Sequence, residues 1–99
     1  METGGYVYIL TNEIKSTLYI GVTSDLRSRI YEHRDHYYPN SFSAKYQLHF
    51  CIYYEQFTSI EEAIQREKQI KKWRREKKEV LINRVNPEWR DYWPEIEKW

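Results

Sequence analysis

The sequence predicts an α+β domain in which a small three-stranded antiparallel sheet is flanked by helices. Runs of strand length, rich in β-branched and aromatic residues, occupy residues 6–10, 17–22 and 48–56. Helical spacing of apolar residues follows the second and the third run. With 99 residues, 40% of them hydrophobic, the chain can bury one small core. Residues 1–99 are therefore expected to form a single domain, with a core over about 6–87 and an aromatic tail at 88–99.

The first two strands are expected to form a hairpin after a loose tail at residues 1–5. The run at 6–10 is apolar or aromatic at every position, which predicts a strand buried on both faces. Residues 11–16 are polar and typical of turns, so they give a six-residue connection to the second strand.

A glycine near the end of the second strand and a capping residue predict a helix over about 25–35. Gly21 lacks a Cβ, which allows either a turn of the backbone or the close approach of a ligand. Ser24 or Asp25 can then cap the helix.

One face of this helix carries two polar residues among its apolar ones. The spacing i, i+3, i+4, i+7 collects Leu26, Arg29, Ile30 and His33. Polar residues that break such a pattern are often functional. The alternative is that Arg29 reaches out to water and His33 is an ordinary edge histidine.

The middle of the chain holds a long loop and a third strand. Residues 36–45 show no periodicity, and a loop of this length in so small a domain tends to be functional. In the third strand, at residues 48–56, alternation predicts two sets of side chains on opposite faces. These are Phe50, Ile52 and Tyr54 on one face, and Cys51 and Tyr53 on the other.

Two further helices follow the third strand. The residues at positions 58 and 59 are each followed three residues later by glutamate, so overlapping capping boxes begin a helix that runs to about Trp73. A helix over about 76–84 is expected to bury Val80 and Leu81. It should end at the asparagine-proline pair that follows, because a residue before proline avoids the helical region.

The inward stripe of the helix after position 59 contains a glutamate near its centre. The stripe consists of Ile60, Ala63, Ile64, Glu67 and Ile70. A buried carboxylate here and a buried Arg29 in the first helix would be costly unless they were paired with each other, with a metal or with a ligand. Two structural alternatives are a buried Arg29–Glu67 salt bridge, and an ion pair of Glu67 with Lys71 on an exposed face.

A dense group of positive charges spans the end of this helix and the start of the next. We call it the basic stretch; it comprises Lys68, Lys71, Lys72, Arg74, Arg75, Lys77 and Lys78. The formal net charge of +1 gives the whole protein no general affinity for nucleic acid, so such binding would depend on a local patch. The alternative is a solvated helix surface. Trp73 within the stretch could stack on a base, although a core position is expected.

Composition excludes several classes of protein. A single cysteine allows neither an internal disulfide nor a multi-cysteine zinc site, which fits a reducing compartment. No apolar run approaches the roughly 20 residues of a membrane span, and residues 1–5 lack the features of a signal peptide. We therefore expect a cytoplasmic protein that does not interact with membranes.

The order of certain residues resembles the GIY-YIG nuclease family. Tyr6-Val7-Tyr8 is followed, eleven residues after its last tyrosine, by Tyr19-Ile20-Gly21. The resemblance spans about residues 6–93 and is closest to the small stand-alone bacterial branch, which tolerates the tyrosine at position 6 where the family name has glycine. The positions that match are Tyr8, Tyr19, Gly21, Arg29, His33, Glu67 and Asn86.

The resemblance implies a DNA endonuclease that hydrolyses phosphodiester bonds with one divalent ion, Mg²⁺ or Mn²⁺. It implies that Glu67 binds the metal, that Arg29 binds the scissile phosphate and that Tyr8 is the general base. Tyr19 and His33 would orient water or phosphate. DNA repair, or processing of branched or single-stranded DNA, is the expected role. The residues expected to bind substrate are Gly21, Lys68, Lys71, Lys72, Arg74, Arg75 and Asn86.

Two other classes of function remain open at this point. The chain could be a nucleic-acid-binding module that kept the nuclease fold without catalysis. It could also be a protein-interaction domain that uses its tryptophan-rich tail. If the chain is a nuclease, Asn86 is expected to connect the C-terminal segment to the site as well as to bind substrate.

Overall fold

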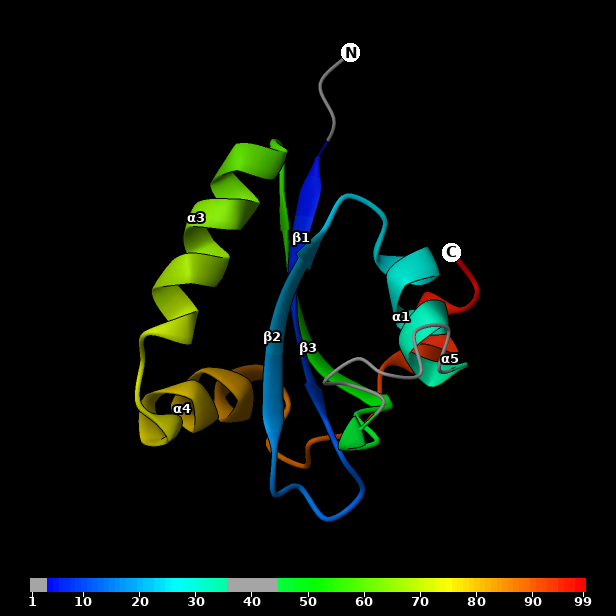
Figure 1. Ribbon diagram of the computed structural model, residues 1–99, viewed down its shortest axis with the longest axis vertical. Helices are drawn as coiled ribbons and strands as arrows, with labels where there is room; N and C mark the ends of the chain where they lie inside the picture. Colours follow the sequence, from blue (N-terminus) through cyan, green and yellow to red (C-terminus); the bar gives the residue numbers. More distant parts are fainter. Residues whose placement is uncertain (1–3, 36–44) are drawn as a thin grey trace.

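The computed structural model describes residues 4–35 and 45–99 and confirms the predicted α+β class (Figure 1). Most of the predicted functional loop at 36–45, and residues 1–3 of the predicted tail, lie outside the described residues. Gly5, which was expected in the loose tail, already belongs to the first strand. The elements in chain order are β1 (Gly5–Thr11), β2 (Leu18–Thr23), α1 (Leu26–Arg34), β3 (Phe50–Phe57), α3 (Ile60–Lys71), α4 (Arg75–Val85) and α5 (Trp93–Ile96).

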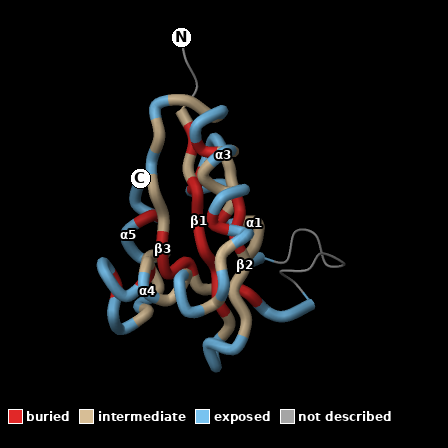
Figure 2. The backbone as a smooth tube through the Cα atoms, turned by 90° about the vertical axis from the view of Figure 1, so that its left-hand side faces the viewer, coloured by how far each residue is buried: buried red, intermediate tan, exposed pale blue. Residues whose placement is uncertain are grey.

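The sheet is antiparallel throughout and has the order β2-β1-β3. Helices α3 and α4 lie on one side of it, and α1 and α5 lie on the other (Figure 1). The central strand β1 is buried on both faces, as predicted, and Figure 2 shows it as the most continuously buried part of the chain. Val7 and Ile9 face the core under α3, whereas Tyr8 and Leu10 face the core under α1.

The predicted alternation of side chains along β3 is wrong because the strand contains a register shift. Ile9 pairs with Tyr53 and Leu10 with Cys51, so Ile52 is an extra residue opposite β1. Ile52 and Tyr53 consequently lie in the same core cluster, and Tyr54 points to the other face of the sheet together with Cys51. Strict alternation cannot anticipate such a shift.

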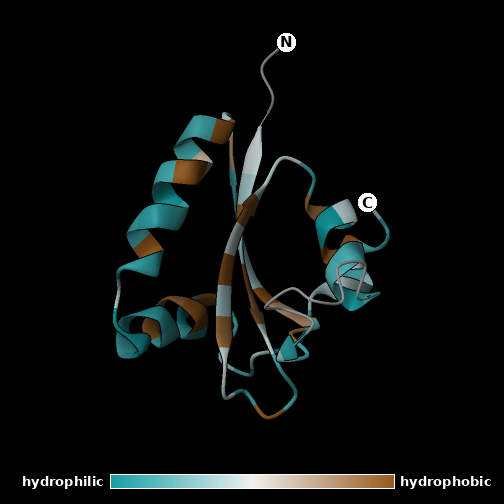
Figure 3. Cartoon of the chain, in the orientation of Figure 1, coloured by the Kyte–Doolittle hydropathy of each residue, from teal (hydrophilic) through white to brown (hydrophobic). Residues whose placement is uncertain are grey.

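Helix boundaries follow the predicted caps. The Oδ1 atom of Asp25 accepts a hydrogen bond from the backbone N–H of Ser28, and Ser59 caps α3 by accepting from the N–H of Glu62. Figure 3 shows that the helices are hydrophilic over much of their length, while hydrophobic residues concentrate in the sheet.

The predicted burial of Val80 is wrong. Val80 is exposed, Leu81 is only partly buried, and Ile82 is the residue of α4 that reaches the core. Residues two apart on a helix point to different faces, so a helix that packs through Ile82 turns Val80 towards solvent.

The C-terminal tail at 88–99 packs against the domain. Trp89 packs on the core under α3, and Tyr92 and Trp93 pack on the core under α1. Ile96, on the short helix α5, is fully buried. Within the described ranges, no helix is long and apolar enough to cross a membrane.

Asn86 joins three segments at the end of α4. Its Nδ2 atom donates to the carbonyl oxygens of Ile52 and Arg90 at 2.9 and 2.8 Å, and its Oδ1 atom accepts from the N–H of Arg90 at 3.0 Å. The Asn86 side chain is buried, and its bond to Ile52 forms away from water, whereas its two bonds to Arg90 are partly buried.

We expect Asn86→Ala to lower the free energy of unfolding by about 2–3 kcal/mol, because buried backbone groups would lose their partners. Urea denaturation measures the effect. Asn83→Ala is the matched control on the same helix, since the bond that the Asn83 side chain accepts from Trp89 is exposed to solvent. Equal losses in the two variants would contradict the role assigned to Asn86.

Candidate active site

The site begins with a tyrosine ring that lies across a glycine. Tyr8 and Gly21 are direct partners in the pairing of β1 with β2. A Cβ atom added at Gly21 would lie 2.3 Å from Cζ of Tyr8 and 2.4 Å from its hydroxyl oxygen. Gly21 has no positive φ, so it is not required for a turn of the backbone. It is required because the Tyr8 ring occupies the space of a side chain.

Helix α1 brings a histidine to this tyrosine. The Tyr8 hydroxyl oxygen lies 3.0 Å from Nε2 of His33, which is hydrogen-bonding distance. Tyr19 completes a ring cluster, with its centroid 6.3 Å from that of Tyr8 and 5.6 Å from that of His33. Buried Leu26 and Ile30 hold α1 against the sheet on this side. The structure therefore brings together three of the predicted catalytic residues.

Burial controls the protonation of this pair. Burial raises the pKa of Tyr8, neighbouring Tyr19 raises that pKa further, and the positive charge of Arg29 lowers it by less. A general-base role for Tyr8 would require its pKa to fall, and the charge of Arg29 alone does not bring that pKa below its ordinary value. Burial and then Arg29 lower the pKa of His33 to about 4, so its imidazole is uncharged at neutral pH. An uncharged imidazole can accept the Tyr8 hydroxyl proton at Nε2 when Nδ1 carries its hydrogen.

Arg29 lies at the edge of this cluster. Its side chain is 39% exposed, and its Nη1 atom is 3.8 Å from Oε1 of Glu32. Glu32 was not among the predicted site residues, although the i, i+3 spacing on α1 could have indicated it. An arginine this accessible, whose contact with the Glu32 carboxylate is long, can turn towards a phosphate.

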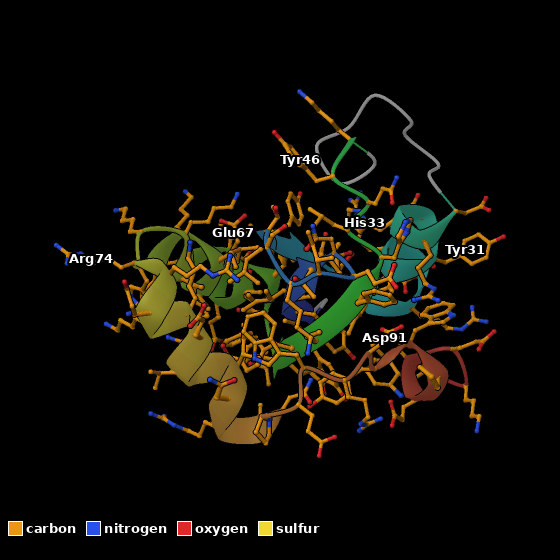
Figure 4. All side chains as sticks on the ribbon, turned by 90° about the horizontal axis from the view of Figure 1, so that it is seen from below. Tyr31, His33, Tyr46, Glu67, Arg74 and Asp91 are labelled. Carbon is orange, nitrogen blue, oxygen red and sulfur yellow. The ribbon has the colours of Figure 1, made fainter. Side chains whose placement is uncertain are left out.

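Glu67 lies on α3, across the sheet from His33. Its side chain is only 13% exposed, and Oε2 lies 3.1 Å from Nζ of Lys71. The predicted pair with Lys71 is thus present, and it joins a largely covered carboxylate to a half-exposed lysine. Within residues 4–35 and 45–99, no ion pair joins Glu67 to Arg29. Although α3 and α1 lie on opposite faces of the sheet, Figure 4 shows that Glu67 and His33 lie towards the same edge of the molecule.

The donor set at Glu67 fits a metal ion that is bound mainly together with substrate. In the described part of the chain, no three His, Cys, Asp or Glu side chains gather into a metal site. Mg²⁺ is commonly held by one or two carboxylates together with water and substrate phosphate oxygens. The half-exposed Lys71 can swing away, which would open its bond to the carboxylate.

The basic stretch divides into exposed and engaged side chains. Lys68, Lys72 and Arg74 are exposed, and Figure 4 shows Arg74 pointing outward at the end of the molecule away from α1. Arg75 instead donates to Glu79 and to the carbonyl oxygens of Ser16 and Lys15, at 2.7–2.8 Å. A substrate contact by Arg75 would have to replace these bonds.

Trp73 occupies the core position that was expected for it. The ring is partly buried against the core under α3. Lys77 and Arg66 lie over it, at 4.3 and 5.2 Å from the ring centroid. These contacts leave little of the ring for stacking on a base.

Comparison with known proteins shows which family the chain belongs to. A family model of the GIY-YIG catalytic domain matches residues 4–80. The chain belongs to the GIY-YIG family. This match includes Tyr8, Tyr19, Arg29, His33 and Glu67, and its residue range ends within α4. Neither a curated protein nor a solved structure gave a significant match. The three-stranded antiparallel sheet with helices is consistent with the GIY-YIG fold.

We expect Gly21→Ala to destabilise the domain by about 1–3 kcal/mol and to break the hydrogen bond of Tyr8 with His33, because the new methyl group displaces the Tyr8 ring. NMR of the His33 ring measures the bond, and denaturation measures stability. Gly5→Ala is the control: its Cβ would crowd Ala63 instead. A Gly21→Ala protein that retained the wild-type His33 signals would contradict this account.

Proposed function

We propose that this GIY-YIG domain is a metal-dependent endonuclease that hydrolyses phosphodiester bonds in DNA. The observation that carries the proposal is the hydrogen bond between Tyr8 and an uncharged His33, formed within reach of the Arg29 charge. Branched or single-stranded DNA in repair is the proposed class of substrate.

The tyrosine and the histidine supply a route for the proton of the attacking water. Tyr8 can act as a general base only after its own proton has left, and Nε2 of His33 lies at 3.0 Å to receive it. The tyrosinate then accepts a proton from water, and the imidazolium holds the first proton. Arg29 lowers the pKa of Tyr8, but it also lowers the pKa of His33, so its charge stabilises the tyrosinate without stabilising the imidazolium. Tyr19 lies against both rings, where it would orient water or phosphate.

Arg29 and Glu67 would act on the phosphate. A guanidinium group can donate two parallel hydrogen bonds to phosphate oxygens and stabilise the charge that develops on them. Glu67 would hold one Mg²⁺ or Mn²⁺ ion, which when bound neutralises negative charge on the phosphate. Lys71, freed from Glu67, could then contact the DNA backbone.

The exposed members of the basic stretch would follow the DNA backbone. Lys68, Lys72 and Arg74 lie on α3 and at its junction with α4, away from the core. Contacts of lysine and arginine with phosphate give affinity without choice of sequence. Gly21, Arg75 and Asn86 remain predicted substrate-binding residues, but their contacts in the structure favour structural roles.

A DNA-binding module without catalysis is the second candidate. Two observations favour it: burial raises the pKa of Tyr8, and the Glu67 carboxylate is paired with Lys71. Both candidates predict DNA binding, and only the nuclease predicts cleavage.

We expect the protein to cut members of a panel of branched and single-stranded DNAs with Mg²⁺ or Mn²⁺, and Arg29→Ala and Glu67→Gln to lower the rate at least about 100-fold because each removes charge stabilisation. Gel assays of cleavage products measure the rate. Arg84→Ala and Glu61→Gln, at exposed positions on α4 and α3, are matched controls that should retain activity. Binding without cleavage by the wild-type protein would favour the second candidate.

We expect the triple substitution of Lys68, Lys72 and Arg74 by alanine to weaken DNA binding and to reduce the slope of log K against log salt. Three lost phosphate contacts correspond to a change of about 2–3 in that slope. Fluorescence anisotropy over a range of salt concentrations measures it. Replacing Lys15, Arg84 and Lys98 removes the same charge elsewhere and should leave the slope closer to that of the wild type. Equal changes in both triple variants would contradict a localised DNA contact.

A further inference from the structure

We propose that Asp91, acting through Arg34, is a positioning residue that holds the end of α1 so that His33 meets Tyr8. The inference rests on the site described under the proposed function. It concerns the C-terminal tail, which lies beyond residues 4–80 that match the family.

Helix α1 depends on outside contacts for its position. It has nine residues, of which only Leu26 and Ile30 are buried. Helices this short are marginal by themselves, and their last turn lacks intrahelical partners for its carbonyl groups. His33 lies in that last turn, so the contacts of the turn decide where its ring points.

Arg34, the residue after His33, connects this turn to the tail. Its Nη1 atom donates to Oδ2 of Asp91 at 2.8 Å and to the carbonyl oxygen of His49 at 3.2 Å. The guanidinium carbon also lies 5.5 Å from the ring centroid of Trp93. Both members of the ion pair are largely covered, at 31% and 21% exposure, so the pair is less screened by water than a surface pair.

Asp91 is itself held firmly. Its Oδ1 atom accepts from the backbone N–H groups of Cys51 and Trp93, both at 3.1 Å. The N–H of Tyr92 donates to the carbonyl oxygen of Cys51 at 2.8 Å, which fastens the tail to β3. The carboxylate therefore links the sheet, α5 and the end of α1, and Figure 4 shows Asp91 between the C-terminal segment and α1.

The tail also holds the beginning of α1. Arg27 donates from Nε to the carbonyl oxygen of Glu97 at 2.9 Å. Ile96 shares the core cluster of Leu26 and Ile30. With α1 fixed at both ends, the tail limits rotation of the helix about its axis, which is the motion that would separate His33 from Tyr8.

Asp91→Asn in the full chain tests the proposal. The amide can keep its oxygen towards Cys51 and Trp93 while its NH₂ group replaces the oxygen that accepts from Arg34. We expect the last turn of α1 to loosen and His33 to become more hydrated, which raises the His33 pKa from about 4 towards its ordinary value near 6.5. Loss of the Asp91 charge alone would lower the His33 pKa, because the positive charge of Arg34 would no longer be balanced and would disfavour the protonated imidazole. NMR titration of the His33 ring therefore separates repositioning from a simple charge effect.

The kinetic expectation is a fall in kcat of about 10- to 100-fold with KM changed less than about twofold, because a small displacement of a reacting group slows the reaction more than it weakens binding. Glu95→Gln is the matched control: it removes an ion pair of the same tail, with Arg90, that does not touch α1. It should leave both the His33 titration and kcat unchanged. Arg34→Lys keeps the charge and should give an intermediate shift.

A folded Asp91→Asn protein with an unchanged or lowered His33 pKa would overturn the proposal, whether or not the protein cuts DNA. If Asp91→Asn does not fold, the same titration of Arg34→Lys tests the proposal, and an unchanged or lowered His33 pKa in that variant would overturn it. A wild-type protein without cleavage would count against the nuclease and leave the NMR result as the test of positioning.

Discussion

The site depends on one steric constraint, the passage of the Tyr8 ring across the backbone at Gly21. Because no side chain intervenes, the hydroxyl reaches beyond β2 towards α1, where it meets His33. The same close packing buries the hydroxyl and raises its pKa. The packing that places the Tyr8 hydroxyl therefore also keeps it protonated, and the positive charge of Arg29 opposes this effect only in part.

The sequence predicted the fold where local signals and tertiary packing agree. The three strands and the end of α4 at Asn86 follow from residue type and spacing alone. At the starts of α1 and α3 the sequence offered two neighbouring capping residues each, and the structure uses Asp25 and Ser59. The errors arose where tertiary contacts decide. The register shift at Ile52 depends on pairing between distant segments, and the exposure of Val80 depends on the rotation of α4 against the sheet.

The candidate site was predictable in part. Arg29, His33 and Glu67 were detectable because each places a polar group on an otherwise apolar helical face. Asp91 was not detectable, because it lies in a tail of mixed charge that has no apolar periodicity against which a polar residue would stand out. Its contacts with Arg34 and the backbone of β3 exist only once segments 40 and 57 residues away have come together.

The register shift in β3 has a consequence for the end of α4 that packs beside it. A residue added to a strand leaves a backbone carbonyl outside the regular ladder. The carbonyl oxygen of Ile52 accepts instead from the amide of Asn86, which thereby acts as a substitute strand partner. Substitution at position 86 and the spacing of residues in β3 are therefore linked. With a regular third strand, the asparagine would lose its bond to Ile52 and keep those to Arg90.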